Sequence, residues 1–221
     1  MRRHDLVMLR PWAAWHSACT PAGSRLWWAA EQWIVRGLPL VVARQASDEA
    51  QVSLGLSLPL RHDRQRLAIT VAPSAIAEVR PPLSITACLP QLPAEYAAPL
   101  RELARRAAAC SAGLGVFGSL AWESLSGEAY RHAASDIDLI CDVATSEQLE
   151  SVLSALQEAA AALPCRLDGE IRFPDGNAVA WREVAGGLKA PAATVLAKGP
   201  HVVCLLPLQQ LLDCLEEACH A

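Results

Sequence analysis

The sequence lacks the long apolar runs of a membrane protein. No uninterrupted stretch approaches the ~20 apolar residues that a membrane-spanning helix requires. The segment HVVCLLPLQQLLDCL, for example, is broken by a proline, two glutamines and an aspartate. The first residues, MRRHDLVMLRPW, carry His4 and Asp5 where a signal peptide would continue into a longer apolar core. We therefore expect neither a membrane segment nor a secretion signal.

The sequence also lacks paired cysteines and a strong net charge. It has no Cys-x-x-Cys pair and no nearby histidine at metal-ligand spacing, which excludes the common zinc motifs and favours reduced thiols in the core. The cysteines are Cys19, Cys88, Cys110, Cys141, Cys165, Cys204, Cys214 and Cys219. The formal net charge of −4 at pH 7 gives no field that would attract nucleic acid, so no nucleic-acid partner is expected. Reduced thiols without a secretion signal predict a cytoplasmic location.

The composition is that of a globular chain, with 52% hydrophobic and 19% charged residues in a length of 221. The proline-rich segment 80–96 predicts an extended connector rather than a regular element. This connector divides the chain into a smaller N-terminal domain of mixed α and β structure, residues 1–94, and a C-terminal domain, residues 95–221.

Hydrophobic periodicity predicts helices and strands in both domains. In the N-terminal domain, a tryptophan-rich helix begins after Ser24 and ends at Gly37, and short strands follow it. Those strands are residues 39–44, 51–58 and 66–72. In the C-terminal domain, the predicted helices are residues 95–110, 119–127, 146–162 and 207–219. The predicted strands are residues 113–117, 136–142, 164–173, 177–184 and 194–205, the last with a break near Gly199-Pro200. This alternation predicts an α/β or α+β fold, with helices packed on a sheet.

Two carboxylates interrupt an otherwise apolar strand in SDIDLICDV. Residues two apart in a strand project from the same face, so Asp136 and Asp138 point together. Ile137 and Leu139 then point into the opposite, buried face. Like charges held side by side are unfavourable without a shared proton or a divalent cation, and Mg²⁺ is the usual cation for such carboxylates beside phosphates. The pair therefore predicts a magnesium site.

A Gly-Ser turn precedes this pair and completes the pattern of a phosphate site. Gly118 allows a close backbone approach, and Ser119 offers a hydroxyl. The predicted helix that follows presents unpaired N–H groups at its positive end. A strand, a Gly-Ser turn, a helix and an Asp-x-Asp strand in this order indicate metal-assisted phosphoryl or nucleotidyl transfer.

These segments carry a resemblance to known families. The stretch VFGSLAWESLSG…SDIDLICDV resembles the nucleotidyltransferase superfamily that includes polymerase β. With RLDGEIRFPDGNAVAWREV downstream, and RHDLVML and GLPLVVAR upstream, nearly the whole chain resembles the phosphoribosyl-dephospho-CoA transferase family of the malonate decarboxylase system. The resemblance implies a nucleotidyltransferase-like C-terminal domain that carries the chemistry.

The resemblance also implies a reaction and roles for the motif residues. The phosphoribosyl-dephospho-CoA group would pass from triphosphoribosyl-dephospho-CoA to a serine of the apo acyl-carrier subunit of malonate decarboxylase, and pyrophosphate would leave. Asp136 and Asp138 match the metal-binding catalytic carboxylates, and Gly118 and Ser119 match the phosphate-binding turn. Alternatives are another magnesium-dependent nucleotidyltransferase that acts on a protein or a small molecule, and a binding module without catalysis.

A third carboxylate is expected from a neighbouring strand, and CRLDGEIRF supplies two candidates. Alternation puts Asp168 and Glu170 on one face, and the sequence does not choose between them. Either would be a catalytic residue that orients the metals or accepts the proton from the attacking hydroxyl.

The sequence does not decide which basic side chains bind the pyrophosphate or a carrier protein. The residues after Ser119 lack the arginine found in many relatives of the superfamily, so Arg131, His132 or Lys198 would neutralise the leaving pyrophosphate. Three arginines of the predicted helix 95–110 cluster on one side: Arg101, Arg105 and Arg106. A solvated helix face is their ordinary interpretation, and a docking patch for an acidic carrier protein is the alternative that the resemblance implies.

Overall fold

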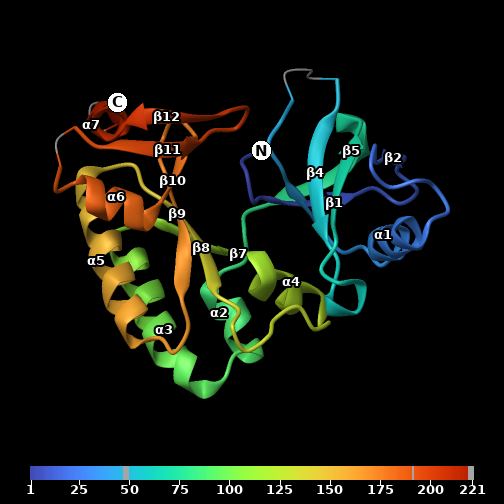
Figure 1. Ribbon diagram of the computed structural model, residues 1–221, viewed down its shortest axis with the longest axis horizontal. Coiled ribbons are helices and arrows are strands. Elements are labelled where there is room, and N and C mark those ends of the chain that lie inside the picture. Colours follow the sequence, from blue (N-terminus) through green and yellow to red (C-terminus); the bar gives the residue numbers. More distant parts are fainter. Residues whose placement is uncertain (47–49, 191, 219–221) are drawn as a thin grey trace. The chain divides into compact units, whose positions relative to one another are not determined.

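The computed structural model describes residues 1–46, 50–190 and 192–218 (Figure 1). In this part the chain forms helices and two six-stranded sheets, which confirms the α+β fold class. Residues Met1–Pro82 and Ala121–His132 form one compact unit, and Leu83–Leu120 with Ala133–Ala221 form the other. Among the described residues, no helix has the length and the apolar character needed to cross a membrane.

The first unit contains an antiparallel sheet and helix α1 (Arg25–Val35). Ser24 caps this helix, because its Oγ accepts a hydrogen bond from the N–H of Trp27, and Gly37 follows the helix with a φ of 69°. The predicted helix is thus confirmed. The strands are β1 (Leu6–Leu9), β2 (Trp15–His16), β3 (Leu40–Val42), β4 (Val52–Ser57), β5 (Arg66–Val71) and β6 (Ile76–Arg80), in the order β2-β5-β4-β3-β1-β6.

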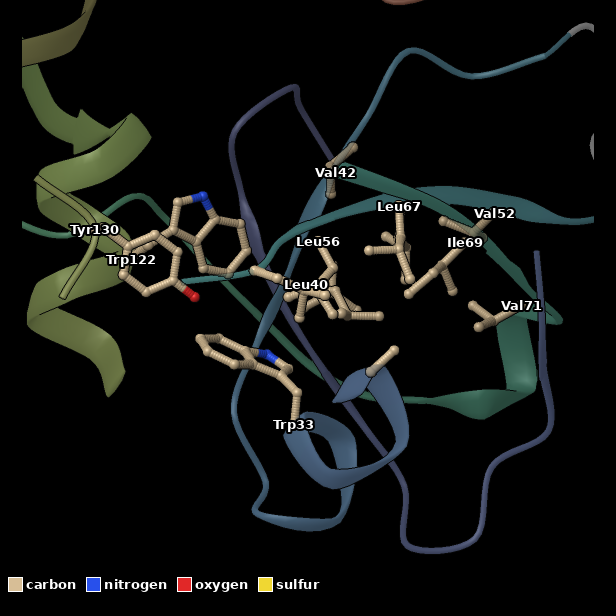
Figure 2. Close-up of a cluster of buried hydrophobic side chains, with 14 residues drawn as sticks. Trp33, Leu40, Val42, Val52, Leu56, Leu67, Ile69, Val71, Trp122 and Tyr130 are labelled. Atoms are coloured by element: carbon tan, nitrogen blue, oxygen red, sulfur yellow. The ribbon is translucent and has the colours of Figure 1, made fainter. Parts of the chain in front are cut away.

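The core of the first unit includes two aromatic residues that come from far along the chain. Trp122 and Tyr130 pack with Trp33 and the apolar side chains of the sheet (Figure 2). Tyr130 is 1% exposed, and its hydroxyl donates a hydrogen bond to the carbonyl oxygen of Ser57 at 2.9 Å. The segment between the Gly-Ser turn and the Asp-x-Asp strand therefore contributes to the core of the first unit.

The second unit contains the sheet with the Asp-x-Asp motif, in the order β12-β11-β10-β9-β8-β7. Its strands are β7 (Gly113–Phe117), β8 (Ile137–Asp142), β9 (Leu167–Arg172), β10 (Ala178–Ala180), β11 (Thr194–Lys198) and β12 (Val203–Pro207). Strands β8 and β9 are parallel, because helix α5 (Ser146–Ala162) crosses over between them, and the other neighbours are antiparallel. The other α-helices of this unit are α2 (Ile85–Cys88), α3 (Ala94–Ala109), α6 (Trp181–Gly187) and α7 (Leu208–Ala218). Helix α4 (Gly118–Ser126) begins in this unit, and its residues from Ala121 on belong to the first.

The two faces of this sheet differ in character. Helices α3 and α5 pack together and against the sheet, as Figure 1 shows, and bury apolar side chains such as Leu103 and Leu156. Ile137 and Leu139 of β8 are each 1% exposed, as the alternation predicts. Asp138 lies between them and so projects from the opposite face. That opposite face carries the site.

Two predicted elements were wrong in part. The segment 80–96 is not an extended connector, because Ser84 caps helix α2 by accepting from the N–H of Ala87, and a 3₁₀ turn follows at Leu89–Gln91. The predicted strand 177–184 stops at Ala180, where the chain turns into helix α6. The division of the chain into domains of residues 1–94 and 95–221 remains a prediction.

Two of the three arginines in the predicted cluster, which lie on α3, form ion pairs, and docking of a carrier at this helix stays a prediction. Arg105 forms an ion pair with Glu102 on the same helix at 2.6 Å. Arg106 points toward α5, where it pairs with Glu158 at 2.6 Å. Periodicity along one helix could not reveal the partner on a second helix.

The cysteines only partly follow the prediction of core thiols. None of those in the described part of the chain forms a disulfide, and Cys88 and Cys141 are buried. Cys19, however, is exposed. Cys219 lies outside the described residues.

Candidate active site

Three carboxylates meet on the face of the second sheet that lies opposite Ile137 and Leu139. Asp138 of β8 and Asp168 of β9 are direct partners in the parallel register. Asp136 comes just before β8, and these three side chains offer carboxylate oxygens that all lie within 4.8 Å of one another. Each residue is half-buried. The structure thus brings together Asp136, Asp138 and Asp168, which we call the carboxylate cluster.

The structure separates the two candidates for the third carboxylate. Asp168 is held at the cluster by two hydrogen bonds of 3.0 Å, from the N–H of Gly169 to Oδ1 and from Arg166 to Oδ2. Glu170 is not in the cluster. Its carboxylate is 7% exposed and accepts a hydrogen bond of 2.8 Å from Lys198 Nζ. The strand register therefore puts Asp168, and not Glu170, beside the Asp-x-Asp motif.

Gly118 lies directly against the carboxylate cluster. Its φ of 71° is in the left-handed region, which glycine adopts without steric cost. A Cβ at this position would lie 2.9 Å from Asp138 Cγ and would collide with Oδ2 of the same side chain. Helix α4 begins at Gly118, so Ser119 lies in its first turn, where backbone N–H groups have no partner within the helix. The predicted Gly-Ser turn thus adjoins the cluster.

A second glycine at the site was missed by the sequence reasoning. Gly169 has a φ of 147°, and a Cβ there would lie 3.0 Å from the carbonyl carbon of Leu139 on β8. The two strands can therefore approach closely at the level of Asp138 and Asp168. A glycine between two carboxylates in a predicted strand was the available signal.

The three side chains predicted to neutralise the pyrophosphate do not all belong to one unit. Arg131 forms an ion pair with Glu123 at 2.8 Å, and both of these residues, like His132, belong to the first unit. Lys198 belongs to the second unit and pairs with Glu170 on the sheet that carries the cluster.

Further along this sheet a buried ion pair lies beside Glu170. Arg172 is 3% exposed and binds Asp142 through two hydrogen bonds, of 2.5 and 2.9 Å. Cys141 lies on the opposite side of β8 from Asp142, and burial raises the pKa of its thiol, so it is not a nucleophile at neutral pH.

The carboxylate cluster suits a hard divalent cation. Its donors are all carboxylate oxygens, which Mg²⁺ prefers over nitrogen and sulfur ligands. Among the described residues, it is the group of acidic, histidine or cysteine side chains whose spacing suits a metal ion. Carboxylates beside a glycine turn and a helix N-terminus are typical of enzymes that transfer phosphate-linked groups.

Comparison with known proteins identifies the family. Residues 82–209 match the model of the phosphoribosyl-dephospho-CoA transferase MdcG C-terminal domain, and residues 2–82 match that of its N-terminal domain. The chain belongs to the phosphoribosyl-dephospho-CoA transferase family, and it is a transferase. This result confirms the family resemblance predicted from the motifs.

Individual relatives cover almost the whole chain. A phosphoribosyl-dephospho-CoA transferase of Xanthomonas axonopodis pv. citri (strain 306) is 40% identical over 207 residues, which cover 93% of each chain. One of Bradyrhizobium diazoefficiens is 33% identical over 216 residues, which cover 96% of this chain and 92% of the relative. One of Pseudomonas fluorescens (strain Pf0-1) is 31% identical over 191 residues, which cover 80% and 84%. No solved structure matches the chain.

Proposed function

We propose that this protein transfers the phosphoribosyl-dephospho-CoA group from triphosphoribosyl-dephospho-CoA to a serine of the apo acyl-carrier subunit of malonate decarboxylase and releases pyrophosphate. The observation that carries the proposal is the carboxylate cluster against Gly118, in a chain whose family is named for this group. A divalent cation, a carrier serine and a triphosphate donor are the components that such a site requires.

Asp136, Asp138 and Asp168 would hold Mg²⁺ in this proposal, since their oxygens lie close enough together to share a cation. When bound, Mg²⁺ neutralises negative charge on the phosphate oxygens. The hydrogen bonds from Gly169 and Arg166 fix the orientation of the Asp168 carboxylate. The three carboxylates would repel one another less with the site occupied.

The proposed chemistry is an in-line displacement at the α-phosphorus of the donor. A bond forms between the serine Oγ and this phosphorus, while the bond from phosphorus to the bridging oxygen of pyrophosphate breaks. The serine proton passes to Asp168, because this carboxylate of β9 lies in the cluster and Glu170 does not. The backbone at Gly118, the hydroxyl of Ser119 and the N-terminal N–H groups of α4 bind the leaving pyrophosphate.

Intact-mass spectrometry of the carrier tests the proposal. The purified carrier is incubated with this protein, Mg²⁺ and triphosphoribosyl-dephospho-CoA, and released pyrophosphate is measured in parallel. We expect the carrier to gain one phosphoribosyl-dephospho-CoA group for each pyrophosphate released. A carrier with alanine in place of its acceptor serine, and a reaction with excess chelator, are the controls.

Unmodified carrier in the complete reaction would contradict the proposal. A parallel reaction with ATP in place of the donor tests the alternative of another nucleotidyltransferase, because the carrier would then gain an AMP group. The cytoplasmic location remains a prediction, which cell fractionation would test.

A further inference from the structure

We infer that Lys198, held in place by the buried carboxylate of Glu170, forms a binding subsite for the pyrophosphate portion of a triphosphate ligand. The inference rests on the proposed function and extends it to a residue outside the carboxylate cluster and the Gly-Ser turn. Lys198 lies on β11 and Glu170 on β9, and Lys198 Nζ donates a hydrogen bond of 2.8 Å to Glu170 Oε1.

The strand register places this pair on the face that carries the carboxylate cluster. Lys198 of β11 is the partner of Ala178 on β10, and Ala178 is in turn the partner of Arg172 on β9. Glu170 is the partner of Ala180. Directly paired residues project from the same face, so the Lys198 side chain reaches Glu170 across two alanines. The small alanine side chains leave space above β10 for this crossing.

The pair also lies close to the carboxylate cluster. Glu170 follows Asp168 by two residues on β9, so the two carboxylates share a face and are separated by about 7 Å along the strand. The Lys198 ammonium group, held at Glu170, is therefore two residues along β9 from the cluster. A polyphosphate bound at the cluster can extend along the sheet to Lys198.

Charge gives the subsite a role in binding. The three carboxylates of the cluster repel a polyphosphate. Arg172 lies nearby, but it is 3% exposed, and its guanidinium already donates hydrogen bonds to both carboxylate oxygens of Asp142. Lys198 differs in exposure, since 34% of its side chain is accessible to solvent. A lysine ammonium is a strong phosphate-binding group.

Glu170 explains why this lysine is positioned rather than mobile. A carboxylate that is 7% exposed is costly to bury, and a buried ion pair is often no more stabilising than apolar side chains of similar size. The pair does, however, fix the end of a long flexible side chain, which would otherwise lose conformational entropy when a ligand binds. We therefore assign Glu170 as a positioning residue for Lys198.

Isothermal titration calorimetry on the full chain tests the subsite with pyrophosphate in excess Mg²⁺ as the probe. Lys198→Gln should weaken pyrophosphate binding by about tenfold, since one hydrogen bond from a charged donor is lost. Lys198→Arg should restore most of the affinity. Lys189→Gln is the matched control, because Lys189 is exposed beyond the end of α6. Dephospho-CoA, which has no triphosphate, should bind all four proteins equally.

A double variant separates binding from structure. Glu170→Gln with Lys198→Gln replaces the ion pair by two amides that can bond to each other, so no buried charge is left alone. We expect it to unfold at a temperature close to the wild type but to bind pyrophosphate as weakly as Lys198→Gln. Wild-type affinity in either variant would overturn the inference, as would a wild-type protein that binds no pyrophosphate.

The outcomes also separate this inference from the proposed function. If the carrier is modified and Lys198→Gln binds pyrophosphate normally, the subsite is wrong while the transfer stands. If the carrier stays unmodified but pyrophosphate binding depends on Lys198, the subsite stands and the proposed acceptor or donor is wrong.

Discussion

Asp138 on β8 and Asp168 on β9 are opposite each other in the parallel register of the second sheet. Because their side chains project from the same face, a pair of strands joined by helix α5 brings together carboxylates that are far apart in the sequence. Asp136 completes the group from the residue before the strand. The proposed magnesium site depends on this register, and the first two predictions test it.

Asp138→Asn should lower the rate of carrier modification at least a hundredfold, because the cation loses a charged ligand. The folded state should be as stable as the wild type or more so, since one of three repelling carboxylates is removed. Initial rates and thermal unfolding measure the two effects. Asp213→Asn is the matched control, because Asp213 is exposed on α7 and an amide can still accept its hydrogen bond from Gln209. A near-normal rate in Asp138→Asn would contradict the assignment.

Asp168→Asn and Glu170→Gln should differ in cation binding. Asp168 contributes to the carboxylate cluster, whereas Glu170 binds Lys198. Mn²⁺ titration followed by electron paramagnetic resonance should show about tenfold weaker binding for Asp168→Asn and nearly unchanged binding for Glu170→Gln. If Glu170→Gln loses the cation and Asp168→Asn keeps it, the third carboxylate has been assigned to the wrong residue.

Gly118→Ala should abolish transfer, because the new Cβ would collide with the Asp138 carboxylate and displace it. Gly127→Ala is the control, since Gly127 has a φ of 70° and no atom within 4 Å of its added Cβ. Both variants should lose about 1 kcal/mol of stability from the left-handed backbone. Only Gly118→Ala should lose activity. Equal activity in the two variants would mean that backbone strain, and not contact with Asp138, explains the glycine.

Glu123→Gln should destabilise the protein in a pH-dependent way. Burial alone would raise the pKa of Glu123, but hydrogen bonds from the N–H groups of Tyr130 and Arg131 and from the Arg131 guanidinium outweigh it and lower the pKa below its usual value. A carboxyl with a lowered folded-state pKa stabilises the fold above its unfolded-state pKa and loses this effect as the pH falls through the folded-state value.

Urea unfolding of the wild type and Glu123→Gln at several pH values measures this difference. We expect Glu123→Gln to be about 2 kcal/mol less stable at pH 7, since hydrogen bonds to a charged acceptor are weakened. The difference in the free energy of unfolding should shrink as the pH falls below 4.5, the ordinary pKa of this carboxyl. A gap that is constant from pH 7 to pH 3 would show that the charge of Glu123 contributes nothing.

Local patterns in the sequence were sufficient for most elements and for two of the three clustered carboxylates. The cap at Ser24 and the spacing of apolar residues predict α1, and alternation in SDIDLICDV places Asp138 opposite the buried Ile137 and Leu139. These predictions succeed because each depends on neighbours within a few residues. The error at 80–96 is a short helix whose serine cap outweighs the proline signal, and the error at 177–184 concerns the end of a strand, where helix α6 begins.

The amino-acid sequence by itself determined the motif, the family and the faces on which the acidic side chains lie. Only the tertiary structure decided between Asp168 and Glu170, because both lie on the same face of β9 and only the register with β8 distinguishes them. The tertiary structure likewise paired Glu170 with Lys198, whose strand is reached only across β10. The physical reason is that alternation is set within a strand, whereas register and cross-strand contacts depend on how the helices and the rest of the sheet pack.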